Sequence, residues 1–356
     1  MGDEDTKFSI FRQHLSVPDQ ERFGQSKPIL RKKPNLTPLK LTIIASELQE
    51  CRIYRNEFQC LREYMEVASI PELWELILKR WVEDYGWNLK HNEATSDMVA
   101  AGKGLSGWVA DALCLLCISH CGLAEDELLQ ILDMLGYRNH QKVTAVHWAA
   151  FRNASKHWIQ EKPNGLLCFW HQSLRSAVEH KLLGVITPVR ESSTHVPQNT
   201  ANHKKTHFHQ VLIRYFQRQT VFWRAYQELP WHMKMSGSWE GLCSFVTSPG
   251  ITDFISKIHN PSLWTRLHLV HYWDVLLEAG CDVSEAFLLS VAKIEAEQYQ
   301  RIKKRPMLSG TLATVQVTHA FRYPSNGASD ACSQVQLTHA LRYTSHSAVD
   351  PRSQVR

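Results

Sequence analysis

Three cysteines near the middle of this 356-residue chain have a spacing that could do chemistry, because together they could hold a metal ion. Cys114, Cys117 and Cys121 recur three and four residues apart, with His120 beside the last. The first two fall on the same helix face as neighbouring leucines or at its margin, where cysteine behaves as a small apolar residue. A structural zinc site also needs ligands from a second element, and no second CxxC or HxxxH is spaced to supply them. The sequence therefore predicts buried thiols and no metal site.

No residue pattern typical of catalysis stands out. We find no paired carboxylates, no Ser–His arrangement and no Cys–His signature. A phosphate-binding loop of the form G-x-x-x-x-G-K-[ST] is also missing, and Gly102-Lys103-Gly104 lacks both its spacing and its hydroxyl. The sequence therefore predicts that the chain is not an enzyme, holds no cofactor and binds ATP or ADP no more tightly than the millimolar range.

Composition indicates a globular protein without a strong electrostatic preference. The apolar fraction is 44%, there are 12 tryptophans, and the formal net charge is +5. This charge is too small to argue for nucleic acid or an anionic membrane. Nine scattered cysteines, no apolar run long enough to span a membrane, and an acidic start without signal-peptide features predict a cytoplasmic protein with reduced thiols.

The first hundred residues predict a block of helices. Thr37 is expected to cap a helix that starts at Pro38. Ser69 and Glu72 form an S-x-x-E capping box, followed by an apolar stripe that ends at Tyr85. The polar, glycine-containing stretch 86–104 is expected to hold a domain boundary.

The next segment has the element order of a winged helix. Pro163-Asn164-Gly165 is a turn sequence, and the short apolar runs on both sides of it predict a β-hairpin. We expect helices before and after this hairpin, over residues 108–120, 125–135, 143–157 and 173–183.

The last third predicts a linker, more helices and a tail. His203 to His209 is expected to be a polar loop leading into a helix, and 228–232 with 237–242 to form the first turn of a helical solenoid. Further helices are expected over 261–278 and 284–303, capped by Asn260 and Ser284. Beyond residue 306, a 20-residue unit occurs twice among polar residues, and we expect disorder.

From about Phe11 to Glu278 the chain resembles the part of NACHT-type STAND proteins with tetratricopeptide repeats that follows the ATPase core. The motifs that carry the resemblance occur in the expected order. They are Asn35–Leu41, Pro71–Trp81, Glu83–Gly86, Gly122–Leu128, Phe169–Arg175 and Glu228–His232. The resemblance implies that Pro38 packs near adenine and that His171 faces the β-phosphate of ADP. Both would be vestigial nucleotide-facing positions, since the phosphate-binding elements are absent from this sequence.

Structural roles compete with these assignments, because Pro38 can simply start a helix and His171 can cap or pack its own helix. If the resemblance holds, the His171 imidazole should point out of its own domain, toward the helical block that contains Pro38.

Together these observations predict a mainly α chain. The expected parts are a lid-type helical block (1–100), a winged-helix domain with a small hairpin (101–187), a linker (188–205), a short solenoid-like array (206–305) and a disordered tail (306–356). We expect a non-catalytic scaffold or regulatory fragment that contacts protein partners. A pseudogene product would have the same sequence features. The alternative is a nucleic-acid-binding winged helix, which would use the cations Arg138, Lys142, Arg152 and Lys156.

Overall fold

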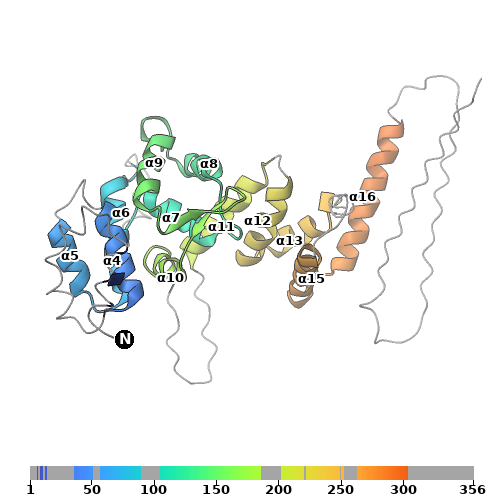
Figure 1. Ribbon diagram of the computed structural model, residues 1–356. Coiled ribbons are helices and arrows are strands. Elements are labelled where there is room, and N and C mark those ends of the chain that lie inside the picture. The colour runs from blue at the N-terminus through green and yellow to red at the C-terminus, as the bar shows by residue number, and fades with distance from the viewer. Residues whose placement is uncertain are drawn as a thin grey trace, which may run out of the picture. The chain divides into compact units, whose positions relative to one another are not determined.

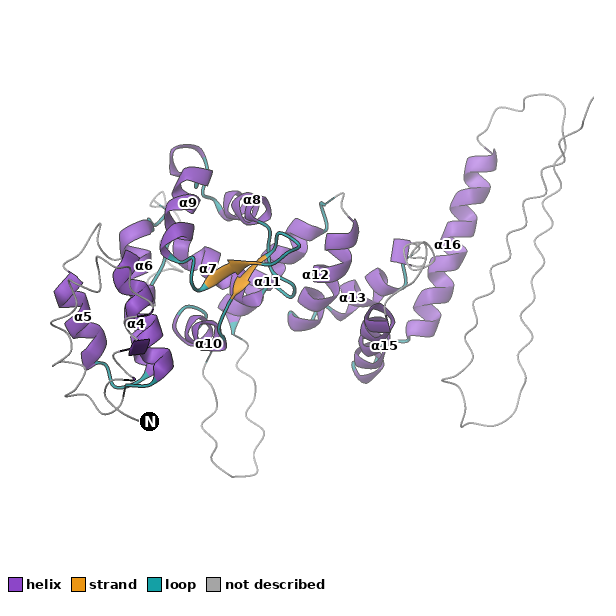
Figure 2. Cartoon of the chain, in the orientation of Figure 1, coloured by secondary structure: helices purple, strands orange, loops and turns teal. Residues whose placement is uncertain are grey.

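The computed structural model describes residues 36–50, 57–89, 105–185, 202–219, 222–248, 250–251 and 263–303, with a few isolated positions before residue 36. Within these ranges the chain is mainly helical, as predicted, with one short antiparallel pair of strands (Figures 1 and 2). The main elements are α4 (Pro38–Glu50), α5 (Glu57–Glu66), α6 (Ile70–Tyr85), α7 (Trp108–Ile118), α8 (Glu125–Leu135), η4 (Asn139–Gln141), α9 (Ala145–Ala154), β1 (Ile159–Glu161), β2 (Leu167–Phe169), α10 (Gln172–Lys181), α11 (His203–Phe216), α12 (Phe222–Met235), α13 (Trp239–Val246), α15 (Leu263–Glu278) and α16 (Val283–Lys303).

The start of α6 follows the capping signals in the sequence. Ser69 Oγ accepts a hydrogen bond from the Glu72 amide at 3.4 Å. The Glu72 carboxylate reaches back to the amide of Ala68 at 3.3 Å, one residue before the position that a standard capping box would use. Two backbone amides at the start of α6 therefore have local side chains as hydrogen-bond acceptors.

The hairpin also forms where the sequence predicts it. Ile159 pairs with Phe169 and Glu161 with Leu167, and the turn between them contains Gly165 at φ +77°. Residues with this backbone conformation are usually glycine, because a Cβ atom would be strained there. The helices α7, α8 and α9 precede the hairpin and α10 follows it, in the predicted order.

One aromatic core joins α6 to the helices around the hairpin. Trp74 of α6 lies edge-on to Trp158 with ring centroids 5.0 Å apart. Trp81 of α6 meets Phe151 of α9 at 5.6 Å, and Phe151 meets Trp108 of α7 at 5.9 Å. These rings are buried, and such pairs add to the free energy of apolar burial. The predicted domain boundary in 86–104 therefore lies between two elements that share one core.

Several predicted element boundaries differ from the structure. Residues 203–209, expected as a loop, all belong to α11, which begins at His203 because Asn202 accepts a hydrogen bond from the Lys205 amide at 3.0 Å. Asp282 caps α16 in place of Ser284, through a 2.9 Å bond from the Glu285 amide. The motif Glu228–His232 lies in the second half of α12, and α5 was not predicted at all.

Other predictions fall on residues that the structure does not describe. They include the tail 306–356, most of the linker before residue 202, and the Asn260 cap. Within the described ranges, no helix is both long enough and apolar enough to cross a membrane.

Candidate functional site: a buried charged joint

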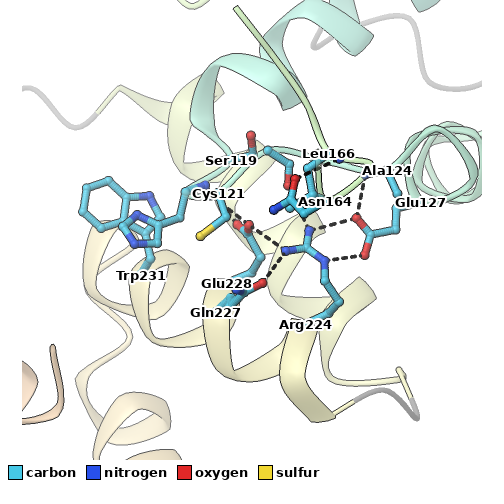
Figure 3. A network of polar contacts seen from close by, with 12 residues as sticks. Ser119, Cys121, Ala124, Glu127, Asn164, Leu166, Arg224, Gln227, Glu228 and Trp231 are labelled. Carbon is cyan, nitrogen blue, oxygen red and sulfur yellow. Dashed lines mark hydrogen bonds and ion pairs between the residues drawn. The ribbon is translucent and has the colours of Figure 1, made fainter. Parts of the chain in front are cut away.

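A network of polar side chains connects α12 to the turn between α7 and α8 (Figure 3). Arg224, Glu228 and His232 are four residues apart on α12, so helical geometry places them on one face. We call these three residues, with Glu127 of α8 and His209 of α11, the joint. Its members are nearly or fully buried.

Arg224 is the cation of the joint. Its Nε and Nη2 atoms donate to the two carboxylate oxygens of Glu127, both at 2.8 Å, in a bidentate ion pair. Nη2 also donates to the Gly122 carbonyl at 2.9 Å, and Nη1 to the Gln227 side chain at 3.0 Å. Burial by itself lowers the pKa of Arg224, but the hydrogen bonds to Glu127 and the charges of Glu127 and Glu228 raise it overall, so the guanidinium stays charged.

Glu228 satisfies backbone groups of the α7–α8 turn. Its two oxygens accept hydrogen bonds from the amides of His120 at 2.9 Å and Cys121 at 3.0 Å, and the side chain has no exposed surface. Without these bonds the two turn amides would lack acceptors in a partly buried place. Burial raises the pKa of Glu228, but its hydrogen bonds and the nearby cation Arg224 outweigh burial and lower the pKa, so Glu228 is a buried carboxylate.

Two histidines extend the joint to α11. His232 Nε2 lies 3.1 Å from the Glu228 carboxylate, which can only accept, so this nitrogen carries a proton. His232 Nδ1 lies 2.8 Å from Nδ1 of His209, and one of these two atoms must therefore be unprotonated. Burial, His232 and Lys205 together lower the pKa of His209 to about 3, which keeps His209 neutral near pH 7.

Trp231 holds the same turn from a second side. Its ring stacks on His120 with centroids 4.6 Å apart, and its Nε1 donates to the Ile118 carbonyl at 3.4 Å. Charged and aromatic side chains of α12 thus contact one turn through its backbone and through the ring of His120. Apart from the buried Nε2 of His209, which has no hydrogen-bond partner among the described residues, the side-chain polar atoms of the joint make contacts within the chain, and this arrangement suits fixing α12 in place.

The two residues expected to face a nucleotide lie at the starts of two different helices. Pro38 is the exposed first residue of α4. His171 is the N-cap of α10, and its Nδ1 accepts a hydrogen bond from the Ser173 amide at 3.0 Å. Ser173 Oγ also lies 2.7 Å from this Nδ1 and accepts a bond from Trp74 Nε1 of α6 at 2.9 Å. The half-buried His171 thus caps its own helix beside α6, and no hydrogen bond links it to Pro38.

The cysteines occupy the apolar positions that the sequence predicted. Cys114 and Cys117 are buried in α7, and burial raises the pKa of Cys117 to about 12. Their thiols are therefore protonated and unreactive. In the part of the chain that the structure describes, no group of His, Cys, Asp or Glu side chains has metal-binding geometry.

The joint was not predicted from the sequence. The motif from Glu228 to His232 stood out only as the predicted first turn of a solenoid and as part of the family resemblance. The spacing of Arg224, Glu228 and His232 was the available signal, because charged residues repeated along one face of a helix with buried neighbours need a partner.

Comparisons with known proteins give relatives at high identity. Over 323 residues, or 91% of its length, the chain is 78% identical to tetratricopeptide repeat protein 41 of Rattus norvegicus. It is 81% identical over 309 residues, or 87% of its length, to the protein of the same name from Mus musculus. It is 70% identical over 315 residues, or 88% of its length, to putative tetratricopeptide repeat protein 41 of Homo sapiens.

The chain spans about a quarter of the length of these curated relatives, 24% for the rat protein and 23% for the other two. No family model matches the chain. No solved structure matches it either. The names of these relatives confirm the predicted similarity to a protein with tetratricopeptide repeats, whereas the resemblance to NACHT-type STAND proteins stays a prediction.

Proposed function

We propose that this chain is a non-catalytic scaffold or regulatory segment of a longer protein similar to tetratricopeptide repeat protein 41, and that it acts through protein–protein contacts. The observation that carries the proposal is the buried joint. It connects the helices from α11 onward to the core around the hairpin. The helices that would face a partner are therefore held in one position on this core.

The energetics of burial explain why such a joint favours one arrangement. Removing charges from water is costly, and the cost is offset only where the ion pairs and hydrogen bonds have good geometry. If α12 shifted by one residue, the Arg224 and Glu228 side chains would leave their partners on the turn. The joint therefore stabilises one register of α12 on the α7–α8 turn and disfavours neighbouring registers.

Several finer assignments belong to the same proposal. The order of helices and hairpin supports a winged-helix domain, and the motif order supports descent from a NACHT-type STAND protein. On this view Pro38 and His171 are vestiges of a nucleotide site. We place the chain in the cytoplasm, and a pseudogene is an alternative origin for it. We expect no ATP or ADP binding below the millimolar range. Micromolar binding of ADP in a calorimetric titration would contradict this expectation.

Nucleic-acid binding is the less supported alternative. Arg138 pairs with Asp133 at 3.2 Å, and Arg152 donates to the Ile159 carbonyl, so both cations are used within the domain. The outward side of α9 carries Val146, Ala149 and Ala150, none of which can bind a phosphate. A winged helix that reads DNA would need cations on this helix.

Hydrogen exchange can test the scaffold proposal. We expect Glu228→Ala to speed amide exchange in α11 and α12 while α6 to α10 keep their protection, because the turn amides lose their acceptor. Glu240→Ala removes an exposed carboxylate of α13 and should change nothing in α11 or α12.

The control within the same measurement is the protection of α6, which shows whether the variant still folds. If Glu228→Ala unfolds the whole chain, Trp231→Leu provides a milder weakening of the same contact. Unchanged protection of α11 and α12 in both variants would show that the joint does not fix these helices, and would remove the support for the proposal.

A further inference from the structure

A surface hollow of about 360 Å³ lies next to the first turn of α9, away from the joint residues. Its walls come from the segment after α6, from η4 and from α9. Among the residues that the structure describes, no acidic side chain lines it. The lining residues are Trp87, Asn88, His140, Gln141, Lys142 and His147.

The walls of the hollow offer hydrogen-bond donors and a positive charge. The ammonium of Lys142 is exposed and has no acidic partner among the described residues. His147 Nδ1 accepts a hydrogen bond from the Thr144 amide at 3.2 Å, so in the neutral ring the proton sits on Nε2, which is a donor. The amides of Asn88 and Gln141 add further donors. These groups suit a carboxylate.

The aromatic wall of the hollow is held in place. Trp87 Nε1 donates to the Gln141 carbonyl at 3.4 Å. Its ring lies edge-on to His147 at 4.9 Å and against Trp108 at 5.5 Å. The hollow therefore has an apolar wall, Trp87, whose ring is held by three contacts within the chain.

An apolar face of α9 adjoins the hollow. Val146 is 76% exposed, beside His147 in the sequence, and Ala149 and Ala150 follow one turn later on the same face. The opposite face packs into the core through Trp148 and Phe151, both fully buried. A largely exposed valine beside a cationic hollow is a combination that an interface would cover.

We propose that the hollow and this face of α9 dock an acidic amphipathic helix of a partner protein. Its apolar side covers Val146, Ala149 and Ala150, and a carboxylate from its edge enters the hollow and pairs with Lys142. Charge complementarity selects the partner, because the described residues of the site offer donors and a cation but no acid. Val146, Ala149 and Ala150 are three and four residues apart, which is the spacing by which one helix packs against another. The inference goes beyond the proposed scaffold role, which concerns the helices from α11 onward, by adding a second contact surface on α9.

A peptide selection can test this docking site. A display library of 15-residue helical peptides, randomised in charge and apolar positions, is selected on the full chain. We expect enrichment of sequences with Asp or Glu beside a Leu or Val stripe. Fluorescence anisotropy of an enriched peptide should then show binding weakened by about tenfold or more in Lys142→Glu and in Val146→Asp.

Matched variants keep the interpretation clear. Val146→Asp places a carboxylate in the first turn of α9, which helices tolerate well, so the variant should fold. Lys293→Glu makes the same charge change as Lys142→Glu on α16 and should leave peptide binding unchanged. Lys142→Glu should also enrich basic peptides when the selection is repeated on it.

Four outcomes would overturn the proposal. They are the absence of enrichment, enrichment of basic peptides on the unaltered chain, peptide binding that persists in Val146→Asp, and binding of a DNA duplex that Lys142→Glu abolishes. Sedimentation showing a dimer that Val146→Asp dissociates would assign the face to a second copy of the chain instead. Hydrogen exchange at the joint is independent of these results, so a failed docking site and a failed scaffold role can be told apart.

Discussion

At the scale of single residues, the guanidinium of Arg224 shows why the joint depends on shape as well as charge. It donates to Glu127 through two nitrogens and to the Gly122 carbonyl at the same time, and its side chain is only 13% exposed. A lysine would carry the same charge but could not reproduce this fork. The backbone carbonyl or one carboxylate oxygen would then lose its donor.

We predict that Arg224→Lys lowers the free energy of unfolding by about 1–3 kcal/mol, because buried acceptors are left unsatisfied. Urea unfolding followed by tryptophan fluorescence measures the change. Arg218→Lys makes the same substitution at an exposed position of the loop after α11 and should leave the midpoint unchanged. Equal midpoints for the two variants would argue against a stabilising role for the Arg224 network.

His171 gives a second prediction at this scale, since its observed contact is the cap of α10. His171→Ala should lower the free energy of unfolding by about 0.5–2 kcal/mol, because the Ser173 amide loses its acceptor. His171→Asn should retain most of the stability, since asparagine is a good N-cap. If the alanine variant is as stable as the unaltered chain, the cap is unimportant and the interpretation of His171 as an outward-facing half-site gains weight.

At the scale of elements, the hairpin and the α7–α8 turn meet through backbone contacts. Leu123 and Leu167 exchange two hydrogen bonds, of 3.3 Å and 2.8 Å. Gly122 precedes this bridge at φ +103°, and a Cβ atom there would lie 2.5 Å from the Leu167 carbonyl oxygen. The close approach requires glycine for two reasons, its backbone conformation and the lack of space.

Gly122→Ala should therefore destabilise the chain more than Gly165→Ala. Both glycines have positive φ, so alanine strains the backbone by about 1–2 kcal/mol at either position. At Gly165 nothing lies within 4 Å of the added Cβ, whereas at Gly122 the strand must move and the Arg224 contact to the Gly122 carbonyl is disturbed. Thermal unfolding of the two variants measures the difference, and a larger loss at Gly165 would refute this explanation.

Local signals predicted most of the elements. The helix over 125–135 has the bounds that its apolar pattern indicated, since Gly136 in the left-handed conformation ends it. The turn sequence located the hairpin. In α5 the buried residues Cys60, Leu61, Tyr64 and Met65 have helical spacing, so periodicity alone could have found that helix. The assignment of residues 203–209 to a loop was wrong because their polar composition concealed the start of a capped helix.

At the scale of the whole molecule, the joint was beyond local sequence patterns. Arg224 and Glu127 are 97 residues apart, and Glu228 and the His120 amide are 108 apart. The sequence of α12 shows that its polar face needs partners, but not which turn supplies them. One partner of Glu228 is a pair of backbone amides, which any sequence would provide, so residue types carry no signal for that contact.

The charge state of the joint makes the stability of the whole chain depend on pH. The pKa of His209 is lowered to about 3 from an ordinary value of 6.5, so between these values the unfolded chain binds a proton that the folded chain does not. Stability therefore rises with pH across this window and is lost as pH falls toward 3. The lowered pKa of Glu228 acts in the same direction below pH 4.5, because its stabilisation is lost as the carboxylate becomes protonated.

We predict that His209→Gln flattens the dependence of the unfolding free energy on pH between 4.5 and 6.5, by up to about 1.4 kcal/mol per pH unit. Glutamine can still hydrogen-bond to His232 but does not titrate. Urea unfolding at several pH values measures the slope, and His203→Gln, at an exposed position in the first turn of α11, controls for the loss of an ordinary histidine. Equal slopes for the His209 variant and the unaltered chain would mean that His209 takes up its proton without cost in the folded state. His209 would then not be the neutral partner of His232 in the joint.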